Sequence, residues 1–201
     1  TYRLFSKDRI QVNKLFKVIT NVVTEQQTNS SFIFGHLDDT LIRKTGKKIP
    51  GTSWKRDPLG PPFHTNFVWG QRFLQISLSL ADNSTNCQSR AIPVDFHHCP
   101  TPTKPKKNAS KEEIDAFKKL QKEQKLTLQA SLRIKELRNI LDSSDAKDKH
   151  LILSVDGSYT NDQVLKNLPK KTTIIGRIRK DASLFSLPTT INTNGRKKVY
   201  G

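Results

Sequence analysis

Two short apolar segments that run directly into aspartate most constrain the fold of this chain. The first, Phe32 to Leu37, is followed by Asp38-Asp39-Thr40, and the second, Leu151 to Val155, is followed by Asp156-Gly157. Apolar runs of this length predict buried strands, and because a buried strand rarely keeps a charge, we expect each acid where its strand ends. Mg²⁺ in proteins is commonly held by one or two carboxylates. The segments therefore predict a sheet whose strand ends carry candidate metal ligands, Asp38 and Asp156.

The other periodic segments predict a mixed α/β order of elements. An amphipathic helix is expected over residues 6–25, and the first strand is expected to form an antiparallel meander with strands at 64–80 and 91–96. These are followed by a long helix or a broken pair of helices at 111–141, a fourth strand at 150–155, a short helix at 161–168 and a fifth strand at 172–178. This is the element order of a ribonuclease H-like fold, with right-handed crossovers expected. In that fold the first and fourth strands are neighbours, so Asp38 and Asp156 would meet.

The charge balance indicates a polyanionic partner. The chain of 201 residues has 35 basic and 18 acidic residues, a formal net charge of +17. Any single basic run is most simply a solvated surface, but here the acids do not balance the bases, which favours nucleic acid. The candidate phosphate-binding residues are Arg43, Lys44, Lys47, Lys48, Arg177, Arg179, Lys180, Arg196, Lys197 and Lys198.

Composition also narrows the setting in which the chain acts. The chain contains no run of about 18 apolar residues, so no membrane span is predicted, and its N-terminus lacks the pattern of a signal peptide. Two cysteines are too few for a disulfide scaffold in a chain of this size. We therefore expect no membrane partner, reduced thiols and a cytoplasmic, nucleoid-associated location.

Four stretches, taken together, resemble a known family. They are LDDTLIRKTGKK, HTNFVWGQRFLQISLSL, LILSVDGSYTN, and IIGRIRKDASLF with the later GRKKVYG. In this order they resemble the ribonuclease H-like catalytic core of DDE-type insertion-sequence transposases of the cut-and-paste class. The resemblance places Asp38 in a D-x-T motif and Asp156 in a D-x-x-Y motif, as catalytic acids that bind Mg²⁺ or Mn²⁺. Side chains alternate along a strand, so only one of Asp38 and Asp39 faces the site, and the motif favours Asp38, with Asp39 as the alternative.

The resemblance also implies an activity and a missing residue. The family's third acid is a Glu on a helix beyond the fifth strand, yet no Glu follows Glu136. We expect an N-terminal helical segment at 1–30 and a core at 31–201 that stops before the third acid and is catalytically incomplete. The implied reaction is two-metal phosphoryl transfer, with cleavage at transposon ends and strand transfer into target double-stranded DNA, by a possible homodimer. The alternatives are a non-catalytic basic nucleic-acid-binding protein and a stand-alone ribonuclease H-like nuclease.

Several of these residues also have an ordinary structural interpretation. Asp38 alone would suit a turn or helix cap, and Asp156-Gly157 alone would suit a hairpin turn. Trp54, Trp69 and Tyr159 are candidates for stacking on unpaired bases, although core packing is the expectation for Trp69. We expect His36 to be a packed strand residue and Asp95 a structural partner.

Overall fold

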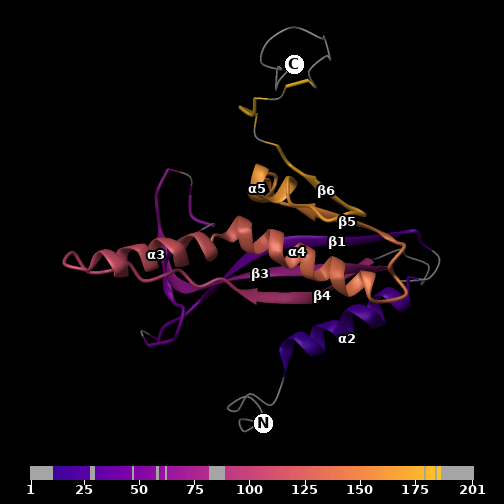
Figure 1. Cartoon of the computed structure of the whole chain (residues 1–201), viewed down its shortest axis with the longest axis horizontal. Coiled ribbons are helices and arrows are strands. Elements are labelled where there is room, and N and C mark those ends of the chain that lie inside the picture. The colour runs from indigo at the N-terminus through magenta and orange to yellow at the C-terminus, as the bar shows by residue number, and fades with distance from the viewer. Residues whose placement is uncertain are drawn as a thin grey trace.

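The computed structural model describes residues 11–27, 30–46, 48–57, 59–61, 63–81, 89–178, 180–183 and 185–186 (Figure 1). Its helices are α2 (Val12–Glu25), α3 (Lys111–Glu123), α4 (Leu126–Asp142) and α5 (Asp162–Leu165), with a 3₁₀ turn η1 at Gly157–Tyr159. Its strands are β1 (Phe32–Arg43), β2 (Ser53–Arg56), β3 (Phe67–Ala81), β4 (Ser89–His98), β5 (His150–Val155) and β6 (Thr172–Gly176). The chain is thus a mixed α/β protein, as predicted.

All six described strands form one mixed sheet. Its order is β2-β3-β1-β5-β6, and β4 also pairs with β3. β3 runs antiparallel to β1, β2 and β4, whereas β1, β5 and β6 run parallel to one another. The predicted antiparallel meander is confirmed, and so is the predicted adjacency of the strands that carry Asp38 and Asp156.

The predicted end of the first strand is wrong, and one strand was not predicted. β1 does not end at Asp38 but continues to Arg43, because β3 pairs with it as far as Gly70 and supplies backbone hydrogen bonds beyond the acids. β2 was not among the predicted elements, and it pairs with the start of β3. The segment at 111–141 is the broken pair of helices rather than one long helix.

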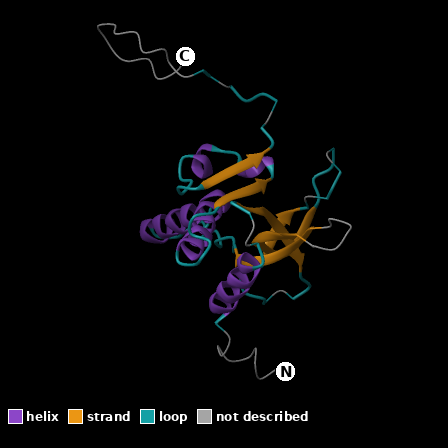
Figure 2. Ribbon diagram, turned by 90° about the vertical axis from the view of Figure 1, so that its right-hand side faces the viewer, coloured by secondary structure: helices purple, strands orange, loops and turns teal. Residues whose placement is uncertain are grey.

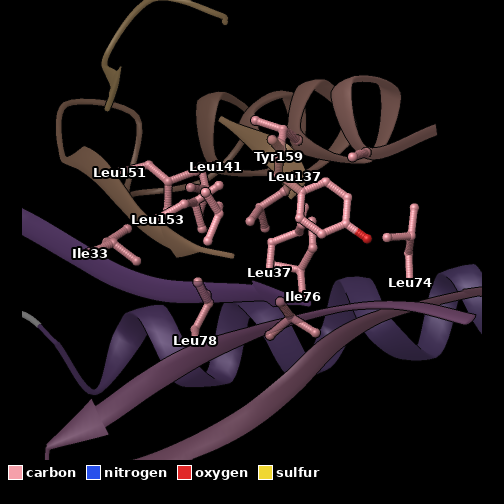
Figure 3. Packing of buried hydrophobic residues seen from close by; sticks show 14 of the residues in the cluster. Ile33, Leu37, Leu74, Ile76, Leu78, Leu137, Leu141, Leu151, Leu153 and Tyr159 are labelled. Atoms are coloured by element: carbon pink, nitrogen blue, oxygen red, sulfur yellow. The ribbon is translucent and has the colours of Figure 1, made fainter. Parts of the chain in front are cut away.

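The hydrophobic core lies between one face of the sheet and the helices α2, α4 and α5. Strand residues that alternate toward this face meet α4, and Figure 3 shows the labelled set: Ile33, Leu37, Leu74, Ile76, Leu78, Leu137, Leu141, Leu151, Leu153 and Tyr159. Each fully buried large apolar side chain contributes about 1.5–3 kcal/mol. The opposite face, called the open face below, is covered by none of the described helices (Figure 2).

Buried charges fix the helices to this core. The carboxylate of Asp95 on β4 accepts two hydrogen bonds from Arg133 of α4, at 2.7 and 2.5 Å, so Asp95 is a structural partner as expected. Arg138 is 2% exposed and donates to Asp142 and to the carbonyl of Lys149, both at 2.9 Å. These bonds hold the end of α4 against the turn that leads into β5, the strand that carries Asp156 at its end.

Candidate metal centre

Asp38 and Asp156 lie at neighbouring positions of two parallel strands. Leu37 pairs with Val155, and both side chains are buried on the core face. Asp38 is the next residue of β1, and Asp156 is the first residue after β5, where it keeps an extended backbone (φ −70°, ψ 160°). Because side chains alternate, both carboxylates point to the open face, on chains that lie roughly 4.8 Å apart. Both residues are exposed.

Asp38 borders a polar depression on the open face. The depression has a volume of about 210 Å³ and is lined by His36, Asp38, Asp39, Thr40, Gln75 and Ser77. One carboxylate oxygen of Asp38, Oδ1, accepts a hydrogen bond of 2.8 Å from the backbone N–H of Asp39. His36 is exposed rather than packed, and its Nε2 lies 3.0 Å from the hydroxyl of Ser79. The carboxylate of Asp38 therefore keeps acceptor positions that face solvent.

Asp156 starts the turn that links β5 to α5. Its Oδ2 accepts a bond of 3.3 Å from the Ser158 hydroxyl, and its carbonyl accepts the N–H of Tyr159 at 2.9 Å. The hairpin interpretation of Asp156-Gly157 is excluded, because β5 and β6 are parallel and joined through α5. Thr160 donates a bond of 2.6 Å to the carbonyl of Arg177, which holds this turn beside the end of β6.

Asp39 belongs to the core face and is already engaged. Its Oδ1 accepts a hydrogen bond of 2.7 Å from the hydroxyl of Tyr159, and its Oδ2 lies 3.2 Å from Arg72 Nε. Tyr159 is fully buried, and this burial, reinforced by the bond to Asp39, raises the pKa of its phenol above the usual range. The expectation that Tyr159 stacks on bases is therefore wrong. Of the two adjacent acids, Asp38 is the one free to face a cation on the open face.

The tether between Asp39 and Tyr159 joins two motifs that sequence reasoning treated separately. It spans 120 positions and ties β1 to the turn that holds Asp156. Arg72 was not predicted to take part in the site. In the sequence, Arg72 is the single charged residue of β3, and this pattern gives no indication of its partner on a neighbouring strand.

The structure locates half of the predicted phosphate-binding residues. Arg43 pairs at 2.8 Å with the buried Asp57, and Lys44 is half-buried. Lys48 and Lys180 are exposed, and Arg177 is exposed one residue beyond the pairing of β6 with the end of β5. The remaining predicted cations lie outside the described residues: Lys47, Arg179, Arg196, Lys197 and Lys198.

On the open face, the described segments offer a cation the exposed carboxylates of Asp38 and Asp156. Across the described ranges, no group of three or more His, Cys, Asp or Glu side chains is placed to hold a metal ion. Hard cations such as Mg²⁺ can be bound through one or two carboxylates, with waters and substrate phosphates completing the shell. The donor set on the open face fits such an ion.

Comparison of the chain with family models, with curated proteins and with solved structures gave no match. Among the described residues, no helix has the length and apolar character needed to cross a bilayer.

Proposed function

We propose that this chain is the catalytic core of a metal-dependent DNA transposase with a ribonuclease H-like fold. The observation that supports the proposal is that Asp38 and Asp156 each directly follow one of the paired residues Leu37 and Val155 of two parallel strands, in a chain of net charge +17. An exposed acid pair on so basic a chain suits a cation that bridges protein and phosphate. The substrate would be double-stranded DNA, cut at transposon ends and joined to a target.

The topology of the sheet supports this proposal. β4, β3, β1, β5 and β6 follow one another across the sheet, and helices join β4 to β5 and β5 to β6. This agrees with the order of a ribonuclease H-like fold, in which the first and fourth strands carry neighbouring acids. β2 is then an addition at the edge of β3. The motifs LDDT and VDGSY place the two acids in this framework.

The chain's own residues have distinct parts in the proposed chemistry. Asp38 and Asp156 would hold Mg²⁺ or Mn²⁺, while Asp39 stays bound to Tyr159 and Arg72 and orients the turn of Asp156. When bound, two such ions supply the Lewis acidity that activates the attacking oxygen and stabilises the leaving oxygen of an in-line displacement. Arg177, the residue that follows β6 next to the C-terminal end of β5, would contact a phosphate. No covalent protein nucleophile is needed.

Binding of Mn²⁺ tests the site separately from catalysis. Titration followed by electron paramagnetic resonance should show bound Mn²⁺ in the wild type and at least tenfold weaker binding in Asp38→Asn and in Asp156→Asn. Asp148→Asn is the matched control, because Asp148 is an exposed aspartate paired with Lys171, which precedes β6. Equal Mn²⁺ affinity in all four proteins would remove the metal centre from the proposal.

Activity then separates the transposase from its alternatives. The longest available form of the chain should nick supercoiled DNA with Mg²⁺ or Mn²⁺ and join a cut end to a target, and Asp156→Asn should abolish both activities while DNA binding persists. Nicking without joining would indicate a stand-alone nuclease. Binding with neither activity, together with unchanged Mn²⁺ affinity in the aspartate variants, would indicate a non-catalytic nucleic-acid-binding protein.

A further inference from the structure

The open face carries a row of aromatic side chains that leads toward Asp38. We call this row the aromatic strip; its members are Trp54, Phe67, Trp69, Phe73, Phe96 and His98. The rings of Trp54 and Trp69 meet edge to face at 5.6 Å. Phe73 stacks on Phe96 at 4.7 Å and on His98 at 4.9 Å. Gly51 packs against the His98 ring and covers this part of the strip, and burial lowers the pKa of His98.

Strand register places the strip on the same face as the metal centre. Asp38 pairs with Gln75 of β3, and alternate β3 residues from Gln75 back to Phe67 point to that face. Trp54 of β2 pairs with Trp69 and so shares it. Trp69 and Gln75 are six positions apart on β3, roughly 20 Å at about 3.4 Å per residue. A nucleic acid strand with stacked bases spaced about 3.4 Å apart would cover this length with roughly six nucleotides. The carbonyls of Gly46 and Pro50 accept hydrogen bonds from Trp69 and Gln71, so the strand would pass over this loop to reach the exposed rings.

The outer end of the strip is unusually exposed. Trp54 is 67% exposed and Phe67 is 56% exposed, whereas Trp69 is half-buried and anchored by a hydrogen bond of 3.0 Å from its indole N–H to the carbonyl of Gly46. The rings of Trp54 and Phe67 remain open to solvent and offer stacking surface, with Trp54 resting against the anchored Trp69. Their faces suit another flat, aromatic group.

The charges around the strip favour a polyanion. Arg56 pairs with Phe67 and is exposed on the open face beside Trp54. Over the described strands, the acids on this face are Asp38 and Asp156, the two candidate metal ligands. A cation next to exposed aromatic rings matches a strand that offers phosphates and unpaired bases together. A duplex hides the faces of its bases within the stack and cannot use the rings in this way.

We propose that the aromatic strip is a stacking platform for a short unpaired stretch of the DNA strand whose phosphate lies at Asp38 and Asp156. The identity of the nucleic acid as DNA rests on the proposed function, and the platform adds to that function a preference for an unpaired stretch of the substrate. It assigns to this chain a substrate that is locally single-stranded about 20 Å from the reacting phosphate, the length worked from the strand rise. Arg56 contacts a phosphate of that stretch, and Trp54 and Phe67 hold its bases.

Intrinsic fluorescence gives a direct test, because the two tryptophans of the chain, Trp54 and Trp69, both belong to the strip. Titration with a twelve-nucleotide oligothymidylate in EDTA should quench this fluorescence, and a blunt duplex of twelve base pairs should quench it less. Stacking is worth about 1–3 kcal/mol per base, so Trp54→Leu and Phe67→Leu should each weaken oligothymidylate binding by about tenfold, measured by anisotropy of a labelled strand. Trp54→Phe should restore most of the affinity.

Phe63→Leu is the matched control, because Phe63 is 90% exposed but lies in the loop after β2. Its affinity for oligothymidylate should stay within twofold of wild type. Equal quenching by duplex and single strand, or wild-type affinity in both strip variants, would overturn the platform. A dimer in sedimentation velocity that Trp54→Leu dissociates would overturn it as well, since a second copy would then cover the face. Because these titrations contain no metal, failure of the metal centre is detected separately, by unchanged Mn²⁺ affinity in Asp38→Asn.

Discussion

Replacing Tyr159 with Phe isolates the hydrogen bond that joins β1 to the turn of Asp156. The ring stays in the core, where Tyr159 is fully buried, and only the 2.7 Å bond to Asp39 is lost. Hydrogen bonds to charged groups contribute about 1.5–3 kcal/mol. Asp39 is 23% exposed and keeps Arg72 nearby, so water replaces part of the loss. We expect Tyr159→Phe to lower the free energy of unfolding by about 1–2 kcal/mol at pH 7, measured by urea denaturation.

The same variant has a pH signature. Burial and the bond to Asp39 raise the pKa of Tyr159 in the folded chain above its value of about 10 in the unfolded chain. Above pH 10 the unfolded chain therefore binds one proton fewer at this site, and stability falls as pH rises, by about 1.4 kcal/mol per pH unit from this group. Below pH 10 the contribution is fully present. Tyr159→Phe removes this slope, so the wild-type advantage should shrink between pH 10 and 11.

Two results would refute this reasoning. A loss below about 0.3 kcal/mol at pH 7 would mean that the bond to Asp39 adds nothing over water. Parallel stability curves for the wild type and Tyr159→Phe above pH 10 would mean that the phenol ionises normally in the folded chain. Far-ultraviolet circular dichroism should be unchanged in the variant, because the aromatic ring and its packing remain.

Three further changes test other parts of the fold. Asp95→Asn leaves Arg133 without its carboxylate in a largely buried setting and should cost about 2–4 kcal/mol in urea denaturation; a loss under 1 kcal/mol would contradict the pairing. Gly35→Ala places a Cβ 2.8 Å from a carbonyl of β3, so it should cost about 1–3 kcal/mol, and a stable variant would show that the strands can separate. Burial raises the pKa of the Cys99 thiol to about 11. In a variant whose other cysteine is serine, alkylation of Cys99 at pH 8 should therefore be roughly a hundredfold slower in the folded chain than in urea. Equal rates would contradict the burial of Cys99.

The local sequence was enough to predict those elements whose bounds depend on neighbouring residues alone. β5 was predicted at its observed bounds, because its apolar run is short and is followed directly by a turn. The break between α3 and α4 was left open, and α3 carries a capping box formed by Ser110 and Glu113. The adjacency of β1 and β5 followed from the element order, and the structure shows that this pair is parallel.

Features that depend on distant partners could not be predicted in the same way. β1 continues beyond Asp38 and Asp39 because β3 extends alongside it. The four residues of β2 form a strand because β3 offers them an edge to pair with. The preference for Asp38 over Asp39 depends on which face the helices cover, and it is supported by the contacts of Asp39 with Arg72 and Tyr159. No periodicity in the sequence encodes a contact between residues 120 positions apart.

The link between Asp39 and Tyr159 has a consequence for ligand affinity. Asp39 adjoins Asp38 on β1, and Tyr159 lies three residues after Asp156, so one partly buried hydrogen bond constrains the two segments that carry the exposed carboxylates, ahead of the cation binding proposed for them. A pre-organised pair loses little conformational freedom on binding, and the full attraction for the ion is expressed as affinity. Loosening this bond should therefore weaken Mn²⁺ binding through entropy, with every ligand still in place.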